Sequence, residues 1–432
     1  MPKKPGPYII LFSLLITLNL FLLSKSSIGS VFNLPFLSIA QISALLGTIL
    51  FSYSFILSSR VRALEDLFGG LDKVYRWHHD VGVWSFSFLA IHFLSLIINS
   101  LILQFSLWSA ITSDGTGAYF AGIVGFFIMA GIIFTIIFSK IRYEHFVNVQ
   151  KFFSIPLALG IFHVLFISSD VSRSPLLGIF ILAHMFLAVM YYSYRGFFYK
   201  TFAPHKEYSV SIAEQKGADI TEIILKPKTD RISFVPGQFG YFGFKSTGVS
   251  RELHPFSFAS AEQDEHIRLA IKNVGDFTAQ LKLLHEGDNV TVYGPYGRFA
   301  ERISEYNAEI VLVGAGIGIT PILSIAHSLS SGSFKGRQTA TLFYCTRNLA
   351  EAVFHAELHS LGEISDAFKY VLHLSKDRGY LNADTIRKTV GKLDNKLFLI
   401  CGPITMMRSL AADLHKQGVP KENIVFEEFK YA

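Results

Sequence analysis

Six long apolar runs, all within the first 200 residues, constrain this chain more than any other feature. Each is close to the roughly 20 residues that a helix needs to cross the hydrocarbon core of a bilayer. Lys3 and Lys4 precede the first run, as in a signal peptide, but no small-residue cleavage site follows. We therefore expect a retained first helix and a six-span bundle in the lipid bilayer. The approximate runs are 8–24, 36–58, 77–103, 118–139, 146–168 and 176–194.

Charge divides the chain at the same place. Residues 1–200 contain 13 Lys/Arg and 7 Asp/Glu, whereas residues 201–432 contain 26 of each. Half of the 432 residues are hydrophobic and 17% are charged, below the quarter or so that is usual in soluble domains. This composition excludes a disordered chain and predicts a membrane half followed by a water-soluble half. The net charge of +6 therefore comes from the membrane half, where basic loops set the orientation in the bilayer. No nucleic-acid partner is expected.

Basic residues between the runs predict the orientation. Lys25 and Arg173 fall on one side, and the positive-inside rule places the other, cation-rich side in the cytoplasm. We expect a multi-pass protein of the inner (cell) membrane with both termini and the second half cytoplasmic. Cys345 and Cys401 form no CxxC motif, so neither a disulfide framework nor a zinc site is indicated. The cation-rich side carries Lys3, Lys4, Arg60, Arg62, Lys73, Arg76, Lys140, Arg142, Arg195 and Lys200.

Histidines within the apolar runs are the first chemical signal, because ionisable groups in lipid are costly. His78 and His92 are 14 residues apart, about 21 Å along a helix and about 40° short of four full turns. They therefore lie near one helix face, one close to each leaflet, which suits two stacked haems. His79 is 13 residues from His92, which turns the two side chains apart, so His78 is the preferred ligand. A single intramembrane histidine more often just bonds a neighbouring helix.

The third run resembles the third helix of the ferric reductase and NADPH oxidase superfamily, through Arg76-x-His78-x-x-x-Gly82 followed by His92. In the fifth run, Tyr143-Glu144-x-Phe146 and His163 resemble that family's fifth helix. The resemblance implies b-type haem, with His78, His92 and His163 as iron ligands. His92 and His163 would hold the outer haem.

The inner haem lacks an obvious second ligand. Gln150 stands where the family has the first histidine of its fifth helix. His145 could replace it, but it lies 18 residues from His163, about 27 Å along an ideal helix, unless Pro156 distorts that helix. The inner haem could instead be five-coordinate or weakly held by Gln150, or the chain could hold one haem. His184, in the sixth run, is interpreted as a hydrogen-bonded interior histidine that supports the outer site.

The second half predicts two soluble domains. Residues 203–303 alternate apolar and polar residues in short runs broken by Gly and Pro, which indicates a small antiparallel barrel. Residues 308–432 alternate buried strands, such as Glu309–Val313 and Lys396–Ile400, with helices, such as Leu349–Leu361. A barrel followed by an open α/β sheet resembles the ferredoxin–NADP reductase family. The expected domains are a haem-binding bundle (1–200), an FAD-binding β-barrel (201–303) and an NADPH-binding α/β domain (304–432).

Motifs in the barrel resemble the flavin-binding segments of the superfamily. Val235–Phe239 precedes His254-Pro255-Phe256-Ser257, where the resemblance puts Pro255 and Phe256 beside the isoalloxazine and the Ser257 hydroxyl near its N5. Gly294–Phe299 resembles the turn that closes the barrel. Between these two segments, from Lys272, we expect Thr278 to cap a helix that runs through Leu284. Free N–H groups at its start suit a pyrophosphate, and the resemblance implies that of FAD. The FAD residues implied are His254, Pro255, Phe256, Ser257, Lys272, Gly275 and Thr278.

The glycine-rich stretch Val313–Pro321 follows a predicted buried strand and opens a helix. Glycines there permit a tight turn and a close approach of phosphate. The sequence is not GxGxxG, yet in this context it resembles the NAD(P) pyrophosphate loop of the reductase family. The residues implied are Gly314, Gly316, Gly318, Thr320 and Pro321.

Three later positions complete the predicted site. Arg347, after the next strand, suits an adenosine 2′-phosphate and therefore NADPH over NADH. Cys401-Gly402-Pro403 resembles the nicotinamide-side turn, whose cysteine positions hydride transfer in the family. Phe429 resembles the terminal aromatic that covers the flavin. Ser257, Cys401 and Phe429 are thus the expected catalytic residues.

Together these features predict a transmembrane oxidoreductase that passes electrons from cytosolic NADPH through FAD and haem to oxygen, producing superoxide. The alternatives are a ferric reductase, with ferric iron as acceptor, and an electron-supply module for a periplasmic or membrane partner. A partner protein is possible but not required. A six-helix transporter with a nucleotide-binding domain fits less well, because no internal repeat or pair of broken helices is visible.

Overall fold

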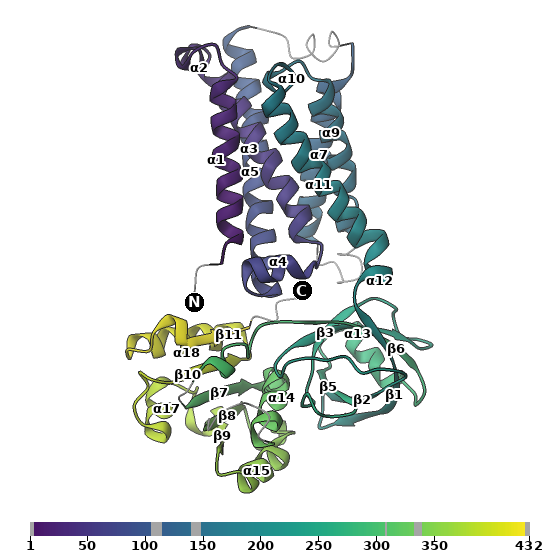
Figure 1. Cartoon of the computed structure of the whole chain (residues 1–432), viewed down its shortest axis with the longest axis vertical. Coiled ribbons are helices and arrows are strands. Elements are labelled where there is room, and N and C mark those ends of the chain that lie inside the picture. The colour runs from purple at the N-terminus through teal and green to yellow at the C-terminus, as the bar shows by residue number, and fades with distance from the viewer. Residues whose placement is uncertain (1–3, 105–114, 140–147, 307–308, 332–338, 428–432) are drawn as a thin grey trace. The chain divides into compact units, whose positions relative to one another are not determined.

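The computed structural model describes residues 4–104, 115–139, 148–306, 309–331 and 339–427 (Figure 1). The chain divides into two compact units, Pro2–Thr201 and Phe202–Tyr431. The first is a helical bundle, and the second carries two β-sheets with their covering helices.

Six helical segments of the first unit are long and apolar enough to cross a membrane, so the predicted six spans are confirmed. They comprise α1 (Gly6–Leu23), α3 (Pro35–Leu57), α5 (Leu71–Ile102), α7 (Ala118–Phe138), Asn148–Phe166 including α9 (Ser154–Phe166), and Pro175–Phe202 including α11 (Pro175–Ser193). The shorter helices are α2 (Ile28–Asn33), α4 (Arg62–Phe68), α10 (Asp170–Arg173), the π-helical turn Tyr194–Phe198 and α12 (Tyr199–Phe202).

Local sequence explains several helix ends. Pro35 and Pro175 open α3 and α11, where the missing N–H costs nothing and the fixed φ suits the first turn. The fifth span is interrupted just before Pro156. Residues 148–151 are helical, a turn follows, and the regular helix α9 starts at Ser154. Since proline cannot donate to the preceding turn, the interruption has the cause expected from the sequence.

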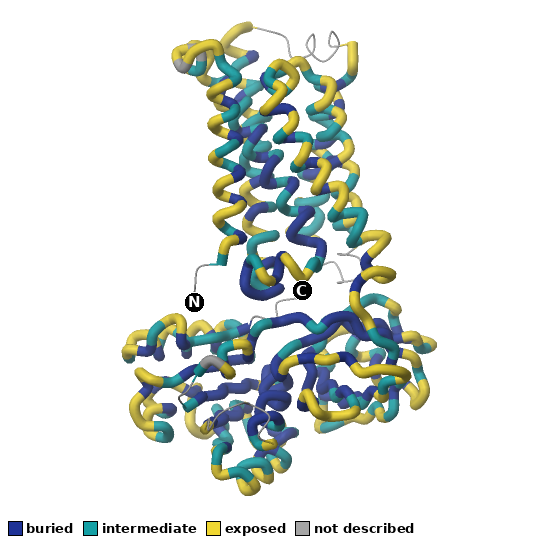
Figure 2. The backbone as a smooth tube through the Cα atoms, in the orientation of Figure 1, coloured by how far each residue is buried: buried dark blue, intermediate teal, exposed yellow. Residues whose placement is uncertain are grey.

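Packing in the bundle is uneven. α3 packs along both α5 and α11, while α7 packs along α9. Phe21 of α1, Ile49 of α3 and Ile181 of α11 lie in one buried apolar cluster. Figure 2 shows exposed stretches along the helices of the bundle. They include many large apolar residues, such as Trp84 at 61% exposure. Apolar outer faces of this kind are what a helix bundle presents to lipid.

The first sheet of the second unit is antiparallel throughout, in the strand order β4-β3-β6-β1-β2-β5. Beyond β4, the Ala259 N–H donates to the Arg268 carbonyl in β5 at 2.8 Å, which joins the two edge strands and closes the predicted barrel. The strands are β1 (His205–Lys216), β2 (Ile220–Pro227), β3 (Phe239–Lys245), β4 (His254–Ser257), β5 (Ile267–Lys272) and β6 (Asn289–Tyr296), with α13 (Asp276–Gln280) after β5.

The second sheet is parallel, in the order β11-β10-β7-β8-β9. From β7 the chain builds outward to β8 and β9 on one side, and later to β10 and β11 on the other. The carboxyl ends of β7 and β10 therefore flank a topological switch point, where open α/β sheets bind ligands. The strands are β7 (Ile310–Ala315), β8 (Ala340–Thr346), β9 (Phe368–Leu374), β10 (Leu397–Cys401) and β11 (Ile424–Phe426).

Helices cover both faces of this sheet. One apolar core lies under α14 (Ile319–Ser330) and α15 (His355–Ile364), and another under α17 (Ala383–Val390) and α18 (Ile404–Lys416). The start predicted for the helix Leu349–Leu361 is wrong. Asn348 caps a single 3-10 turn, Leu349–Glu351, and α15 begins at His355, after Phe354 has turned into the core at 1% exposure.

Candidate functional site

The predicted flavin segment lies on the edge strand β4. Ser257 pairs with Phe239 of β3 and is 9% exposed, while His254, Pro255 and Phe256 are half-buried. The His254 ring stacks on Phe277 of α13, with centroids 3.5 Å apart and an interplanar angle of 17°. This stacking joins strand β4 to helix α13, two elements more than 20 residues apart in the chain.

The segment from Lys272 to Thr278 differs from the prediction. The helix starts at Asp276, before Thr278, and ends at Gln280, and only a 3-10 turn, Leu281–Leu283, follows. The Thr278 hydroxyl accepts from the N–H groups of Val274 and Gly275, both at 3.0 Å. Thr278 thus caps the helix from inside its first turn, by accepting from the N–H of the N-cap residue Gly275, but the helix is shorter than predicted. Lys272 forms an exposed ion pair with Asp219 at 3.2 Å.

The glycine loop after β7 is shaped by close approach. A Cβ on Gly318 would lie 2.6 Å from the Cys401 carbonyl, and one on Gly314 would lie 2.6 Å from the Ile319 side chain. Gly316 has φ of +54° and open space where a side chain would project. The loop leads directly into α14, so its N–H groups lie at a helix N-terminus, which favours phosphate. Thr320 and Pro321 follow in the first turn of α14 and are buried.

The structure brings this loop against the turn after β10. Gly402 passes the loop so closely that a Cβ there would lie 2.7 Å from that of Ala315, and Pro403 follows at the start of α18. Cys401 is fully buried, and burial raises the pKa of its thiol well above the ordinary value. The Cys401 thiol therefore stays protonated and neutral at neutral pH.

Glu427 is a candidate site residue that sequence reasoning missed. It is 4% exposed, interacts electrostatically with Cys401, and lies 3.1 Å from where a Cβ on Gly297 would be. A carboxylate is thus buried between the end of the barrel and the end of β10. The signal available was an acidic residue two positions before the expected terminal aromatic. That aromatic, Phe429, lies outside the described residues.

The two sheets meet along α14. The Ser324 hydroxyl donates to the Ser260 carbonyl at 2.6 Å. The Thr320 hydroxyl lies 2.9 Å from the Ile317 carbonyl and 3.3 Å from the Ala270 carbonyl of β5. Ser260 lies three residues after Ser257. The predicted flavin segment and the predicted nicotinamide loop are therefore tied together through main-chain acceptors of the barrel.

A basic edge extends from the predicted Arg347. Arg347 is exposed after β8, and its carbonyl accepts from the Lys376 N–H at 3.1 Å. Lys376 and Arg378 lie in α16 (Ser375–Arg378), directly after the neighbouring strand β9, and are also exposed. The buried His373 closes this turn by donating from Nε2 to the Gly379 carbonyl at 2.8 Å. The sequence prediction missed both added cations, because they are near Arg347 only through strand pairing.

The three predicted intramembrane ligands share one geometry. Nδ1 of each lies 2.8 Å from a backbone carbonyl of another helix: His78 on Ser54, His92 on Ala40, and His163 on Ala118 at the start of α7. Since a carbonyl only accepts, Nδ1 must carry the proton, so the coordinating lone pair is on Nε2. His163 is also close enough to His92 to interact with it electrostatically.

Other polar groups in the spans differ from this pattern. The His79 side chain is 75% exposed and contacts its neighbour Asp80 at 3.3 Å. His184 bonds the Phe180 carbonyl of its own helix at 2.9 Å, the hydrogen-bonded interior position expected for it. Gln150 lies in the short helical stretch before the interruption, and His145 lies outside the described residues. The described part of the chain contains no cluster of three or more His, Cys, Asp or Glu that could hold a metal ion by itself.

Family models match three consecutive parts of the chain. Residues 43–161 match the ferric reductase like transmembrane component, residues 205–300 an FAD-binding domain, and residues 312–412 the oxidoreductase NAD-binding domain. The chain is thus a membrane oxidoreductase with flavin- and nicotinamide-binding domains. The resemblance to the NADPH oxidase and ferric reductase superfamily, with a ferredoxin–NADP reductase-type second half, is confirmed by this order of domains.

Individual relatives match parts of the chain. The gamma subunit of sulfhydrogenase 2 from Pyrococcus furiosus is 24% identical over 50% of this chain and 81% of its own length. A superoxide-generating NADPH oxidase heavy chain from Dictyostelium discoideum is 32% identical over 27% of this chain and 19% of its own. The chain spans 66% or less of several further curated relatives. The flavohemoglobin structure from Malassezia yamatoensis, 16% identical with a TM-score of 0.53, covers 91% of this chain and 98% of its own, and is similar in fold.

Proposed function

We propose that this protein passes electrons from NADPH through FAD to b-type haem across a membrane. The observation that carries the haem part is that His92 on α5 and His163 on α9 each bond, through Nδ1, a carbonyl of another helix, and that the two rings interact electrostatically. Such outer hydrogen bonds fix the tautomer and ring orientation that an iron ligand needs. Haem supplies one-electron chemistry when bound, and the protein's part is to hold and insulate it.

The residues near His163 fit such a ligand. A Cβ on Gly122 of α7 would lie 2.7 Å from the His163 Nδ1, so the glycine leaves room for the ring to reach the Ala118 carbonyl. His78 has the same kind of bond, to Ser54, and Arg195 interacts with it electrostatically. This supports a second haem near the cytoplasmic side, with Gln150 in place of the usual second histidine.

The haem count separates these possibilities. We expect purified protein to contain two haems per FAD, measured as the pyridine haemochrome against released flavin. His78→Ala should remove one of them, while the neighbouring variant His79→Ala should retain both. A ratio of one in the wild type, unchanged in His78→Ala, would reject the second haem and leave the His92–His163 site intact.

On the soluble side, each element supports a distinct part of nicotinamide binding. The N–H groups of the Gly314–Gly318 loop suit the pyrophosphate. The cations Arg347, Lys376 and Arg378 suit a 2′-phosphate, which favours NADPH over NADH. The neutral Cys401 thiol lies beside the glycine loop, and the buried Glu427 carboxylate is close enough to interact with it electrostatically. This supports a role for both in orienting the nicotinamide ring and excluding water.

Oxygen is the acceptor we propose, with superoxide as product. The similarity to a superoxide-generating oxidase supports oxygen, while the ferric reductase like match keeps ferric iron as the second candidate. The test is reduction of cytochrome c by NADPH in air, with and without superoxide dismutase. Strong inhibition by the dismutase is the expected result. Activity that the dismutase leaves unchanged, together with anaerobic reduction of a ferric chelate, would replace oxygen by iron.

We also propose that the reductase half faces the cytoplasm from the inner membrane. The excess of Lys and Arg on one set of loops supports this orientation. Of the two cations on the other side, Lys25 pairs with Asp170 at 2.7 Å, which further reduces the free positive charge there. A reporter enzyme that works only in the cytoplasm should be active when it is fused after residue 427. Activity of a reporter that works only in the periplasm would reverse the assignment.

A further inference from the structure

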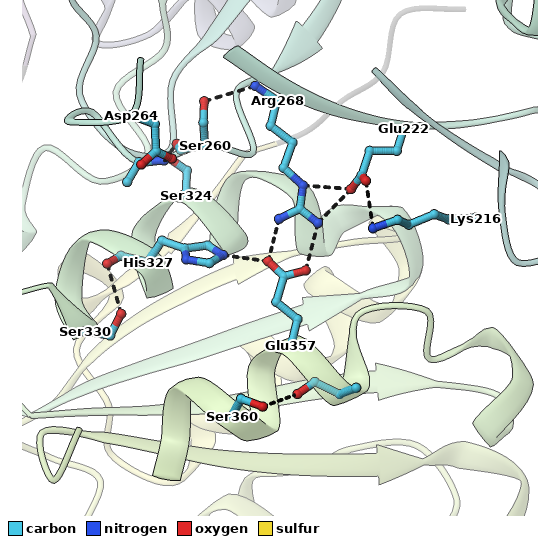
Figure 3. Close-up of polar contacts among 12 residues, drawn as sticks. Lys216, Glu222, Ser260, Asp264, Arg268, Ser324, His327, Ser330, Glu357 and Ser360 are labelled. Atoms are coloured by element: carbon cyan, nitrogen blue, oxygen red, sulfur yellow. Dashed lines mark hydrogen bonds and ion pairs between the residues drawn. The ribbon is translucent and has the colours of Figure 1, made fainter. Parts of the chain in front are cut away.

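Arg268 on β5 is the centre of an ion cluster that joins the barrel to the nicotinamide domain (Figure 3). Its Nε lies 2.7 Å from Glu222 Oε1 on β2, and its terminal nitrogens lie 2.5 and 2.7 Å from the two oxygens of Glu357 on α15. Glu222 also pairs with Lys216, and Glu357 with Nε2 of His327 on α14 at 2.6 Å. Strands of the barrel and covering helices of the nicotinamide domain thus meet at one guanidinium.

The cluster is largely removed from solvent. The side chains of Arg268 and Glu222 are 17% and 6% exposed, and Glu357 is 26% exposed. Burial opposes the ionisation of Glu357, but the hydrogen bonds and charges of Arg268 and His327 outweigh it and hold its pKa at about 2. The pair is therefore charged at neutral pH. Separating the partners would leave an uncompensated buried charge, which is costly. The ion pairs therefore resist changes in the distance between the two domains.

The main chain of β5 links this cluster to the reaction site. The side chains of Ile267, Leu269 and Ile271 belong to the barrel core, so the alternate residues Arg268 and Ala270 face the other domain. The Ala270 carbonyl lies 3.3 Å from the hydroxyl of Thr320, two residues after Gly318.

Arg268 is also bonded to the flavin segment. Its N–H donates to the Ser260 hydroxyl at 3.2 Å, and its carbonyl receives the Ala259 N–H. The Ser260 carbonyl in turn receives the Ser324 hydroxyl of α14. A shift of α15 relative to β5 would therefore be transmitted to both the segment that follows Ser257 and the helix that follows the glycine loop.

We propose that Arg268, through its bidentate contact with Glu357, is a positioning residue for hydride transfer: it fixes the distance between bound NADPH and FAD. The inference rests on the proposed function. The reaction it would govern moves one hydride from the dihydronicotinamide to the flavin, giving NADP⁺ and reduced flavin. The hydride carries two electrons and one proton. A misplacement of about 1 Å at such a step can slow it about 10²-fold.

The test uses full-length protein in detergent, loaded with FAD, with anaerobic stopped-flow bleaching of the flavin by saturating NADPH. Arg268→Lys keeps the charge but cannot bond both carboxylates bidentately, and Glu357→Gln keeps the shape but loses the charge. Both should bleach about 10–100-fold more slowly than wild type. With NADPH deuterated at the transferred position, their isotope effect should exceed that of wild type, since hydride transfer becomes more fully rate-limiting.

Lys206→Met is the matched control, because it breaks an exposed pair of the same barrel, Lys206 with Asp230 at 3.1 Å, and should leave both readouts unchanged. Bound FAD is measured in every sample. Bleaching within twofold of wild type, an unchanged isotope effect, or a loss that only parallels lost FAD would overturn the positioning role. Failure of the wild type itself to bleach with NADPH would instead reject the proposed function.

Discussion

The membrane unit and the reductase unit stabilise their polar groups in different ways. In the described part of the bundle, the functional candidates are neutral rings, and His78, His92 and His163 each bond one backbone carbonyl of another helix. In the reductase unit, charged groups are buried together, as in the Arg268 cluster. Lipid offers no compensation for an isolated charge, whereas a soluble interface can bury one if it is fully paired.

Glycine serves both units, but against different neighbours. In the bundle, Gly122 makes room for a side chain, the His163 ring. In the reductase unit, Gly318 makes room for main chain, the carbonyl of Cys401. A side chain can move aside at moderate cost, while two packed backbones cannot. The same substitution should therefore have unequal effects in the two units.

The largest expected effect is loss of haem from the bundle. His92→Ala should abolish the absorbance of the haem held between α5 and α9, while NADPH still bleaches the flavin. His184→Ala is the control, because His184 bonds a carbonyl within its own helix. Equal haem content in His92→Ala and wild type, by pyridine haemochrome, would show that the site is elsewhere.

The next effect is expected in the reductase unit. Gly318→Ala places a Cβ 2.6 Å from the main chain of Cys401 and Gly402, so the loop must move. Flavin bleaching by NADPH should fall about 10²-fold with haem retained. Gly362→Ala, whose Cβ would make an ordinary 3.4 Å contact, should behave as wild type. Stopped-flow rates for the two variants that agree within threefold would contradict the close packing of the two turns.

A smaller effect is expected from the corresponding change in the bundle. Gly122→Ala should displace the His163 ring, shifting the haem Soret band and midpoint potential without abolishing haem binding. Gly131→Ala lies in the same helix α7 and meets no atom within 4 Å, so its spectrum should not change. Redox titration of both variants makes the comparison. An identical potential in the two would argue against a constrained His163.

The smallest effect concerns pH. The folded pKa of Glu357, about 2, is below the ordinary value of 4.5, so the contribution of its carboxylate is complete above about pH 4.5 and lost as pH falls towards 2. Glu357→Gln should lower the melting temperature of the reductase unit by several degrees at pH 7, since a lost charged partner costs about 1–3 kcal/mol. The difference should shrink below pH 4.5 in fluorescence-monitored melts. A difference that is constant between pH 7 and pH 3 would contradict the ion pair with Arg268 and His327.

Sequence reasoning succeeded where the signal is local. Apolar runs of bilayer length predicted the six spans, and the glycine loop after an apolar strand predicted the opening of α14. It was less accurate for the helix after β5, whose length and hydrogen bonds depend on which neighbouring groups its polar side chains bond. Thr278 caps a helix as expected, but that helix ends at Gln280 and does not run through Leu284, and the Thr278 hydroxyl accepts from both Val274 and Gly275.

By itself, the sequence determined the spans, the order of the membrane, FAD-binding and NAD-binding parts, and the position of the glycine-rich loop, because each depends on the periodicity or backbone freedom of neighbouring residues. Only the tertiary structure decided which carbonyl orients each intramembrane histidine, that Gly318 meets Cys401, and that Arg268 joins Glu222 to Glu357. These contacts join residues 24 to 89 positions apart. They depend on how whole helices and strands pack, and no local pattern encodes that.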